Sequence, residues 1–141
     1  MSENGQLLSS SLTGVKWKNA DARRWQLCLD FEVALVGLDN IVIYAEEPLS
    51  LQNGKTTRVL TLAAGALWAT AAKYGIEWHW VDVAHWKKEI VGKGSADKKM
   101  IAEWAISDGA DEGWEQDFYD AYAIMRLGVK KNAATTQTDN S

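Results

Sequence analysis

The sequence predicts a single α/β domain, on three observations. Segments with the apolar period of a helix alternate with short apolar or alternating segments typical of β-strands. The chain has 141 residues, a one-domain length, and 47% of them are hydrophobic, which is ample for one core. The apolar period is lost after Gly128. We therefore expect a domain over residues 1–128 and a disordered C-terminal tail over residues 129–141.

The chain is expected to begin with a turn, a strand and a helix. Asn4-Gly5 is a hairpin turn signal, and the Ser, Thr and Val run that follows predicts a strand over residues 6–16. Asp21 is a plausible N-cap for an amphipathic helix that Gly37 would end. Its core-facing stripe is predicted to be Ala22, Trp25, Leu29, Val33 and Val36.

A second strand and a long helix follow. "NIVIYAEEP" predicts a buried strand that stops at Pro48 and brings the carboxylates of Glu46 and Glu47 to its C-terminal end. "KTTRVLTLAAGALWATAAKYG" has the period of a long helix that ends near Gly75. Within this helix, Gly65 is the expected point of close packing.

The second half of the chain predicts one more strand and three helices. Residues 76–83 alternate as a strand, and residues 84–91 form a short helix before the turn "GKG". Ser95 is the expected cap of the next helix, with Asp97 in its first turn. The last helix is predicted from about Glu115 to Arg126.

Charge and cysteine content narrow the function classes. The net charge is -4, but a basic segment precedes an acidic one. The basic segment contains Lys87, Lys88, Lys93, Lys98 and Lys99. This distribution suits a site that binds a polyanion beside metal ions, and solvated helix faces give the same pattern. Cys28 is the only cysteine, so neither an intramolecular disulfide nor a zinc site with cysteine spacing is expected. We expect a cytoplasmic protein, with no signal peptide and no membrane span.

Eight tryptophans are a high count for this length. Five fall at positions compatible with a core: Trp25, Trp68, Trp78, Trp104 and Trp114. Trp86 lies beside Lys87 and Lys88, and it is the tryptophan we expect to contact nucleic acid, if any does.

Asp117 and Asp120 form the most informative pair in the sequence. Residues at i and i+3 share a helix face, with Phe118, Ala121, Tyr122 and Met125 on the neighbouring core face. The two carboxylates repel unless a cation lies between them, and hard divalent ions such as Mg²⁺ prefer all-oxygen ligands. The alternative is that both aspartates only favour the start of the helix through its dipole.

Three blocks together resemble the RuvC-type Holliday junction resolvases, nucleases of the RNase H-like fold. The blocks are "IYAEEPL", "HWKKEIVGKGSADKKMI" and "DFYDAYAI", in this order and at the family's spacing. The likeness covers about residues 4–128 and is closest to short, often phage-encoded members. It implies a mixed sheet flanked by helices.

The resemblance also implies a reaction and its residues. It makes Glu46, Asp117 and Asp120 catalytic metal ligands for Mg²⁺ or Mn²⁺, with a pair of ions in the site. It places Lys87 and Lys98 near the scissile phosphates. We add Lys88, from the same basic segment, and Arg58 as further DNA contacts. The implied reaction is hydrolysis of phosphodiesters in four-way-junction or other branched DNA by a symmetric homodimer.

The sequence also departs from the family pattern. Family members open with a central strand that carries Asp-x-Gly, and this chain starts at the turn that follows the second strand. We therefore expect a fold that is N-terminally truncated, without its first strand and with one carboxylate fewer. A fragment, a partner that supplies the strand, and an inactive relative all stay open. The main hypothesis is a metal-dependent endodeoxyribonuclease; the alternative is an impaired remnant that binds DNA or a partner without cleaving.

Overall fold

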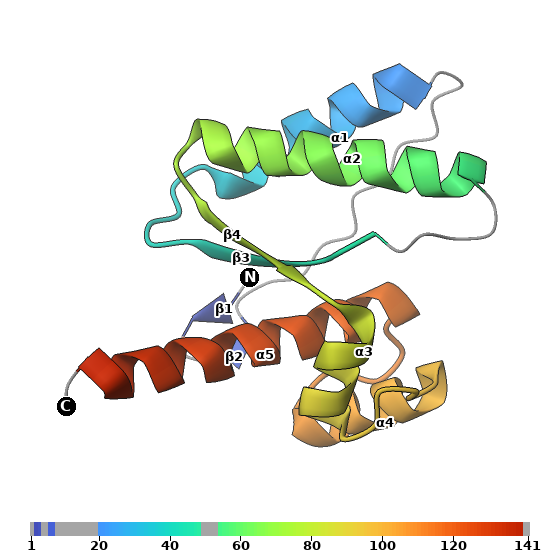
Figure 1. The fold of residues 1–141 in the computed structure, drawn as a ribbon, viewed down its shortest axis with the longest axis vertical. Helices are drawn as coiled ribbons and strands as arrows, with labels where there is room; N and C mark the ends of the chain where they lie inside the picture. The colour runs from blue at the N-terminus through green and yellow to red at the C-terminus, as the bar shows by residue number, and fades with distance from the viewer. Residues whose placement is uncertain (1, 4–5, 8–19, 49–53, 140–141) are drawn as a thin grey trace. The chain divides into compact units, whose positions relative to one another are not determined.

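A computed structural model describes residues 2–3, 6–7, 20–48 and 54–139 of the chain (Figure 1). The chain divides into two compact units. Leu12–His79 form one, which we call the α1–α2 unit. Met1–Ser11 and Trp80–Ser141 form the other, which we call the α5 unit. The described chain contains both helices and strands, with a helix before, between and after the strands of a small parallel sheet, so the predicted α/β class is confirmed.

The α1–α2 unit contains two helices and most of a two-stranded sheet. The elements are α1 (Ala20–Leu35), β3 (Val42–Glu46), α2 (Gly54–Lys73) and β4 (Glu77–Val81). The strands β3 and β4 pair in parallel, and α2 is the crossover between them (Figure 1). Helices α1 and α2 lie in contact, and Glu32 of α1 accepts hydrogen bonds from Lys73 and Tyr74.

Helix α1 has the predicted extent, but its predicted core-facing stripe is wrong. Gly37 has φ +78° and ends the helix as expected. The exposed fractions are 70% for Trp25, 40% for Leu29, 73% for Val33 and 76% for Val36. A different face of α1 is half-buried. On that face the Phe31 ring packs edge-on against the Trp78 ring, with the ring centroids 6.5 Å apart. Because α1 carries apolar residues on more than one face, their period alone does not select the buried face. Asp21 lies inside the first turn, paired with Arg24, and is not the N-cap.

Two expectations about packing in this unit are also wrong. Residues 42–45 of β3 are half-buried rather than buried, because the described part of the sheet has only two strands. Gly65 of α2 is not a point of close approach, since a Cβ added there would meet nothing within 4 Å. Ala71 is the residue of α2 that is fully buried.

The α5 unit begins with two short antiparallel strands. These are β1 (Ser2–Glu3) and β2 (Gln6–Leu7), with Ser2 opposite Leu7 and Glu3 opposite Gln6. The predicted turn residues Asn4-Gly5 lie outside the described residues. The predicted strand over 6–16 begins where expected, and its remaining residues lie outside the described part of the chain.

Three helical elements directly follow β4. These are α3 (Val83–Trp86), the π-helix η1 (Lys87–Val91) and α4 (Lys98–Asp108). Gly92 ends η1 with φ 92°, and its N–H donates to two carbonyls of η1. The cap of α4 is Asp97 rather than Ser95, because Asp97 accepts from the Met100 N–H at 2.9 Å directly before the helix.

Helix α5 (Gln116–Asp139) is longer than predicted. It begins at the predicted place but continues past Arg126 through residues 129–139, which we expected to be a disordered tail. Lys130 Nζ lies 3.2 Å from Glu89 Oε2, so this extension contacts η1. The hydrogen bond from Lys130 holds the pKa of Glu89 below its usual value.

The core of the α5 unit is built from alanine, aliphatic and aromatic side chains. Among its buried residues are Val81, Trp86, Ile101, Ala105, Tyr119, Tyr122, Ala123 and Leu127. Trp86 is 0% exposed, so the expectation that it contacts nucleic acid is wrong. No helix in the described ranges has the length and apolar content that would cross a membrane.

Candidate functional site

The first turns of α5 carry both predicted aspartates. Asp117 is exposed, and Asp120 is half-buried. Their spacing of three residues places them on one side of the helix. Gln116, the first residue of α5, donates from Nε2 to Asp120 Oδ1 at 2.9 Å. Sequence reasoning missed Gln116, although a glutamine four residues before an aspartate is a recognisable helical pair.

Tyr119 fixes the segment that leads into this helix. Its side chain is buried, and its hydroxyl donates to the Asp111 carbonyl at 3.1 Å. The same hydroxyl accepts from the Trp114 N–H at 3.1 Å. The Trp114 ring lies 5.9 Å from the rings of Phe118 and Tyr119. The turn that carries the candidate ligands is therefore held by two hydrogen bonds and an aromatic cluster.

The buried side of α5 differs in detail from the expectation. Tyr122 is buried and Phe118 and Met125 are half-buried, whereas Ala121 is exposed. Ala123 and Leu127 are fully buried instead. The helix therefore docks through a row rotated slightly from the predicted one, and Asp117 stays on the solvent side.

A polar network joins the end of α4 to α5. The Tyr122 hydroxyl donates to Asp108 Oδ2 at 3.0 Å and lies 3.1 Å from the Asp108 carbonyl oxygen. Arg126 Nε donates to Asp108 Oδ2 at 2.6 Å. Burial raises the pKa of Tyr122, so its hydroxyl keeps its proton. This network ties the last residue of α4 to two residues of α5.

Glu46, the third predicted ligand, lies in the α1–α2 unit. It is the exposed last residue of β3, at the C-terminal end of the strand as predicted. Its approach to Asp117 and Asp120 stays a prediction. No three acidic, histidine or cysteine side chains gather as a metal site in the portion of the chain that is described.

The two aspartates on α5 offer the type of ligand atom, carboxylate oxygen, that hard divalent cations prefer. Asp117 and Asp120 supply carboxylate oxygens from successive turns of one helix. The hydrogen bond from Gln116 engages only one oxygen of Asp120. Two carboxylates are fewer ligands than such an ion takes, so further donors have to come from elsewhere, Glu46 being the predicted one.

The predicted basic residues surround the turn between η1 and α4. Lys87 is half-buried, with Nζ 5.7 Å from the centre of the Trp86 ring, whereas Lys88 and Lys98 are exposed. Gly94 allows this turn to close, since a Cβ there would lie 3.3 Å from the Ala84 carbonyl oxygen. Arg58 is exposed on α2 of the other unit.

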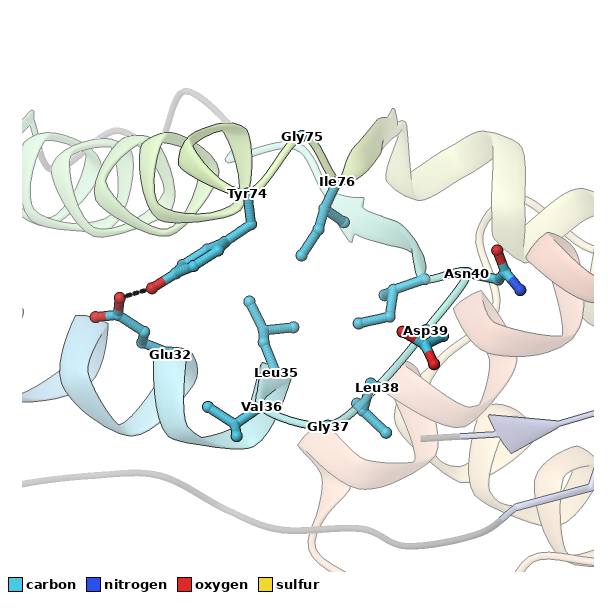
Figure 2. A pocket seen from close by; sticks show the side chains of 11 residues that line it. Glu32, Leu35, Val36, Gly37, Leu38, Asp39, Asn40, Tyr74, Gly75 and Ile76 are labelled. Carbon is cyan, nitrogen blue, oxygen red and sulfur yellow. Dashed lines mark hydrogen bonds between the residues drawn. The ribbon is translucent and has the colours of Figure 1, made fainter.

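A pocket of about 450 Å³ lies in the α1–α2 unit. Neither Glu46 nor Arg58, the predicted site residues of this unit, lines it. It is lined by the end of α1, residues 36–41 and residues 74–76 (Figure 2). Tyr74 and Glu32 meet at its wall through a hydrogen bond (Figure 2). The pocket precedes β3 and β4, so it lies at their N-terminal ends, whereas Glu46 ends β3. None of the predicted site residues lines it.

Comparisons with known proteins identify the fold. No protein-family model matches the chain, and no curated protein matches its sequence. A structure of RuvC from Thermus thermophilus is similar, with a TM-score of 0.67 at 17% sequence identity. The match covers 84% of this chain and 76% of the RuvC chain. The chain therefore has a RuvC-like fold, and its helices and small parallel sheet fit the RNase H-like class.

Proposed function

We propose that the chain is a metal-dependent endodeoxyribonuclease that hydrolyses phosphodiesters in Holliday junctions or other branched DNA. The observation that carries this proposal is the Asp117 and Asp120 pair, held on the anchored first turns of α5 in a chain with a RuvC-like fold. The "DFYDAYAI" resemblance and the basic turn between η1 and α4 support it. The setting we propose is recombination, repair or phage DNA processing in the cytoplasm of a bacterial or phage-infected cell.

In this proposal the acidic residues bind the metal and the basic residues bind DNA. Asp117, Asp120 and Glu46 hold Mg²⁺ or Mn²⁺ through carboxylate oxygens. A pair of such ions would activate water and stabilise the leaving oxygen. Lys98 and Lys88, both exposed, contact phosphates beside the cut, and the half-buried Lys87 is the more rigid contact. Arg58 is the proposed backbone contact of the α1–α2 unit.

We also propose that the active form is a homodimer, since a four-way junction offers two symmetric strands to be cut. The dimer rests on the resemblance alone. Sedimentation with and without junction DNA would measure it. A single monomeric species in both conditions would contradict the dimer while leaving the nuclease activity to be judged separately.

The test of the nuclease uses labelled four-way junctions in Mg²⁺ and in Mn²⁺. We expect cleavage that Glu46→Gln or Asp120→Asn lowers by roughly a hundredfold or more. Glu103→Gln, an exposed position on α4, is the matched control and should cleave normally. No cleavage in either metal, together with unchanged metal binding by Asp120→Asn, would refute the proposal.

A second candidate is a DNA-binding protein that does not cleave. It is favoured by the basic turn between η1 and α4, where Lys88 and Lys98 are exposed, because such lysines bind DNA phosphates whether or not the chain cleaves. This candidate predicts junction binding that weakens steeply with salt, without nicking. Lys98→Ala should reduce the slope of log K against log salt by about 1. Wild-type cleavage that Glu46→Gln abolishes would exclude it.

A further inference from the structure

The side chain of Gln116 forms a hydrogen bond with one of the two candidate ligands, Asp120, and not with the other, Asp117. Its amide donates to Asp120 Oδ1 at 2.9 Å, and both side chains are half-buried. No second hydrogen bond or ion pair to the Asp120 carboxylate occurs among the described residues, so Oδ2 is left for a ligand from outside. Asp117, in contrast, is exposed and makes no side-chain hydrogen bond or ion pair within those residues. One carboxylate is therefore oriented, and the other can rotate.

The glutamine is itself held in place. Gln116 begins α5 two residues after Trp114, whose N–H donates to the buried Tyr119 hydroxyl. The Trp114 ring also contacts the rings of Phe118 and Tyr119. The backbone of Gln116 is thus anchored on both sides, which restricts the positions that its amide can take beside Asp120.

A neutral donor suits this position chemically. A lysine or arginine at 116 would orient Asp120 but would also neutralise the charge that attracts a cation. A carboxamide donates a hydrogen bond without adding charge. Hydrogen bonds of this kind commonly orient carboxylates that bind metal ions.

We infer that Gln116 is a positioning residue that presents Asp120 Oδ2 to a divalent cation, and that Asp120 consequently contributes more to cation binding than Asp117. This inference rests on the proposed function. It goes beyond that function because it assigns a role to a residue outside the predicted ligand set and unequal contributions to the two aspartates.

The competing explanation is that the pair only stabilises the helix. Glutamine and aspartate four residues apart stabilise helices by a few tenths of a kcal/mol. The chain supplies a matched control on α1, where Gln26 Nε2 donates to Asp30 Oδ1 at 2.8 Å with the same spacing and similar burial. A purely structural role predicts the same outcome for both pairs.

The test measures Mn²⁺ binding to the full chain by electron paramagnetic resonance of the free ion. The variants are Gln116→Leu, Gln26→Leu, Asp120→Asn and Asp117→Asn, each checked for folding by urea denaturation. We expect Gln116→Leu to weaken Mn²⁺ binding about tenfold. Gln26→Leu should bind within about twofold of the wild type while losing similar stability. Asp120→Asn should weaken binding more than Asp117→Asn.

The outcomes separate this inference from the proposed function. If Asp120→Asn removes binding but Gln116→Leu matches the wild type, Gln116 has no positioning role and the nuclease proposal stands. Equal losses in Gln116→Leu and Gln26→Leu also overturn the inference, because only general helix stability would explain them. A wild-type chain that binds no Mn²⁺ and cleaves no junction would overturn both.

Discussion

Tyr122→Phe is the substitution with the best-defined energetic consequence. It removes one hydroxyl and keeps the ring, whose contacts with Trp104 and Trp114 have centroid distances of 6.1 and 6.2 Å. The hydroxyl bonds to Asp108 Oδ2 at 3.0 Å and accepts from Arg126 at 3.3 Å. The substitution does not remove the ion pair between Arg126 Nε and Asp108 Oδ2, which are 2.6 Å apart. Asp108 therefore keeps a partner after the substitution.

The magnitude follows from this geometry. A hydrogen bond to a charged group contributes about 1.5–3 kcal/mol to stability. The side chain of Asp108 is 34% exposed, so water partly replaces the lost donor. We expect the free energy of unfolding to fall by about 1–2 kcal/mol at pH 8. Urea denaturation measures this through a lower midpoint with an unchanged slope.

The pH dependence provides an independent check. Burial raises the pKa of Tyr122 in the folded chain above the unfolded value, which is about 10. Above pH 10 the unfolded chain loses this proton first, so the stabilisation present below pH 10 declines as pH rises through the folded pKa. Tyr122→Phe has no such proton, and the stability gap should narrow in alkali. A gap below about 0.5 kcal/mol at pH 8, or one that widens in alkali, would refute the reasoning.

Three further predictions concern stability. Gly94→Ala should destabilise the chain by about 1 kcal/mol, because its Cβ would crowd a backbone oxygen. Gly65→Ala lies in open space within α2 and should stabilise the chain by about 0.5–1 kcal/mol. Equal changes in the free energy of unfolding, measured by urea denaturation, would contradict this pair of predictions. Asp97→Ala should lower the free energy of unfolding by about 1 kcal/mol and Ser95→Ala should not, since only Asp97 caps α4; thermal melts compare the two. Trp86→Ala should cost about 3–5 kcal/mol or prevent folding, because this side chain is fully buried; a well-folded variant by near-ultraviolet circular dichroism would argue against its place in the core.

The order of elements was predictable because local signals decide it. Gly37 and Gly75 adopt positive φ where the helical period stops, and these stops locate the ends of α1 and α2 within a few residues. The end of α5 was not predictable in this way. Its continuation past Arg126 includes a contact between Lys130 and Glu89, residues far apart in the chain, and sequence period does not report such contacts.

Burial was harder to predict than secondary structure. Trp25 and Trp86 have the same chemistry, yet one is 70% exposed and the other 0%. The lysines next to Trp86 suggested a binding surface, but long side chains such as Lys87 can extend from a buried neighbour to solvent. The position of the two aspartates on α5 was predictable from spacing, whereas the bond from Gln116 depends on side-chain rotamers that spacing does not determine.

The π-helix η1 bears on how length changes should be interpreted in this segment. Its hydrogen bonds span one residue more than those of an α-helix, so it has the geometry of an α-helix that has accepted a one-residue insertion. Deleting one residue between 87 and 91 would restore α-helical geometry and leave the segments on either side nearly in phase, because the π turn absorbs the extra residue. Gapless alignment to a shorter sequence would then equate lysines that point in different directions. Gly92, whose left-handed backbone ends the helix, is the better anchor for such an alignment.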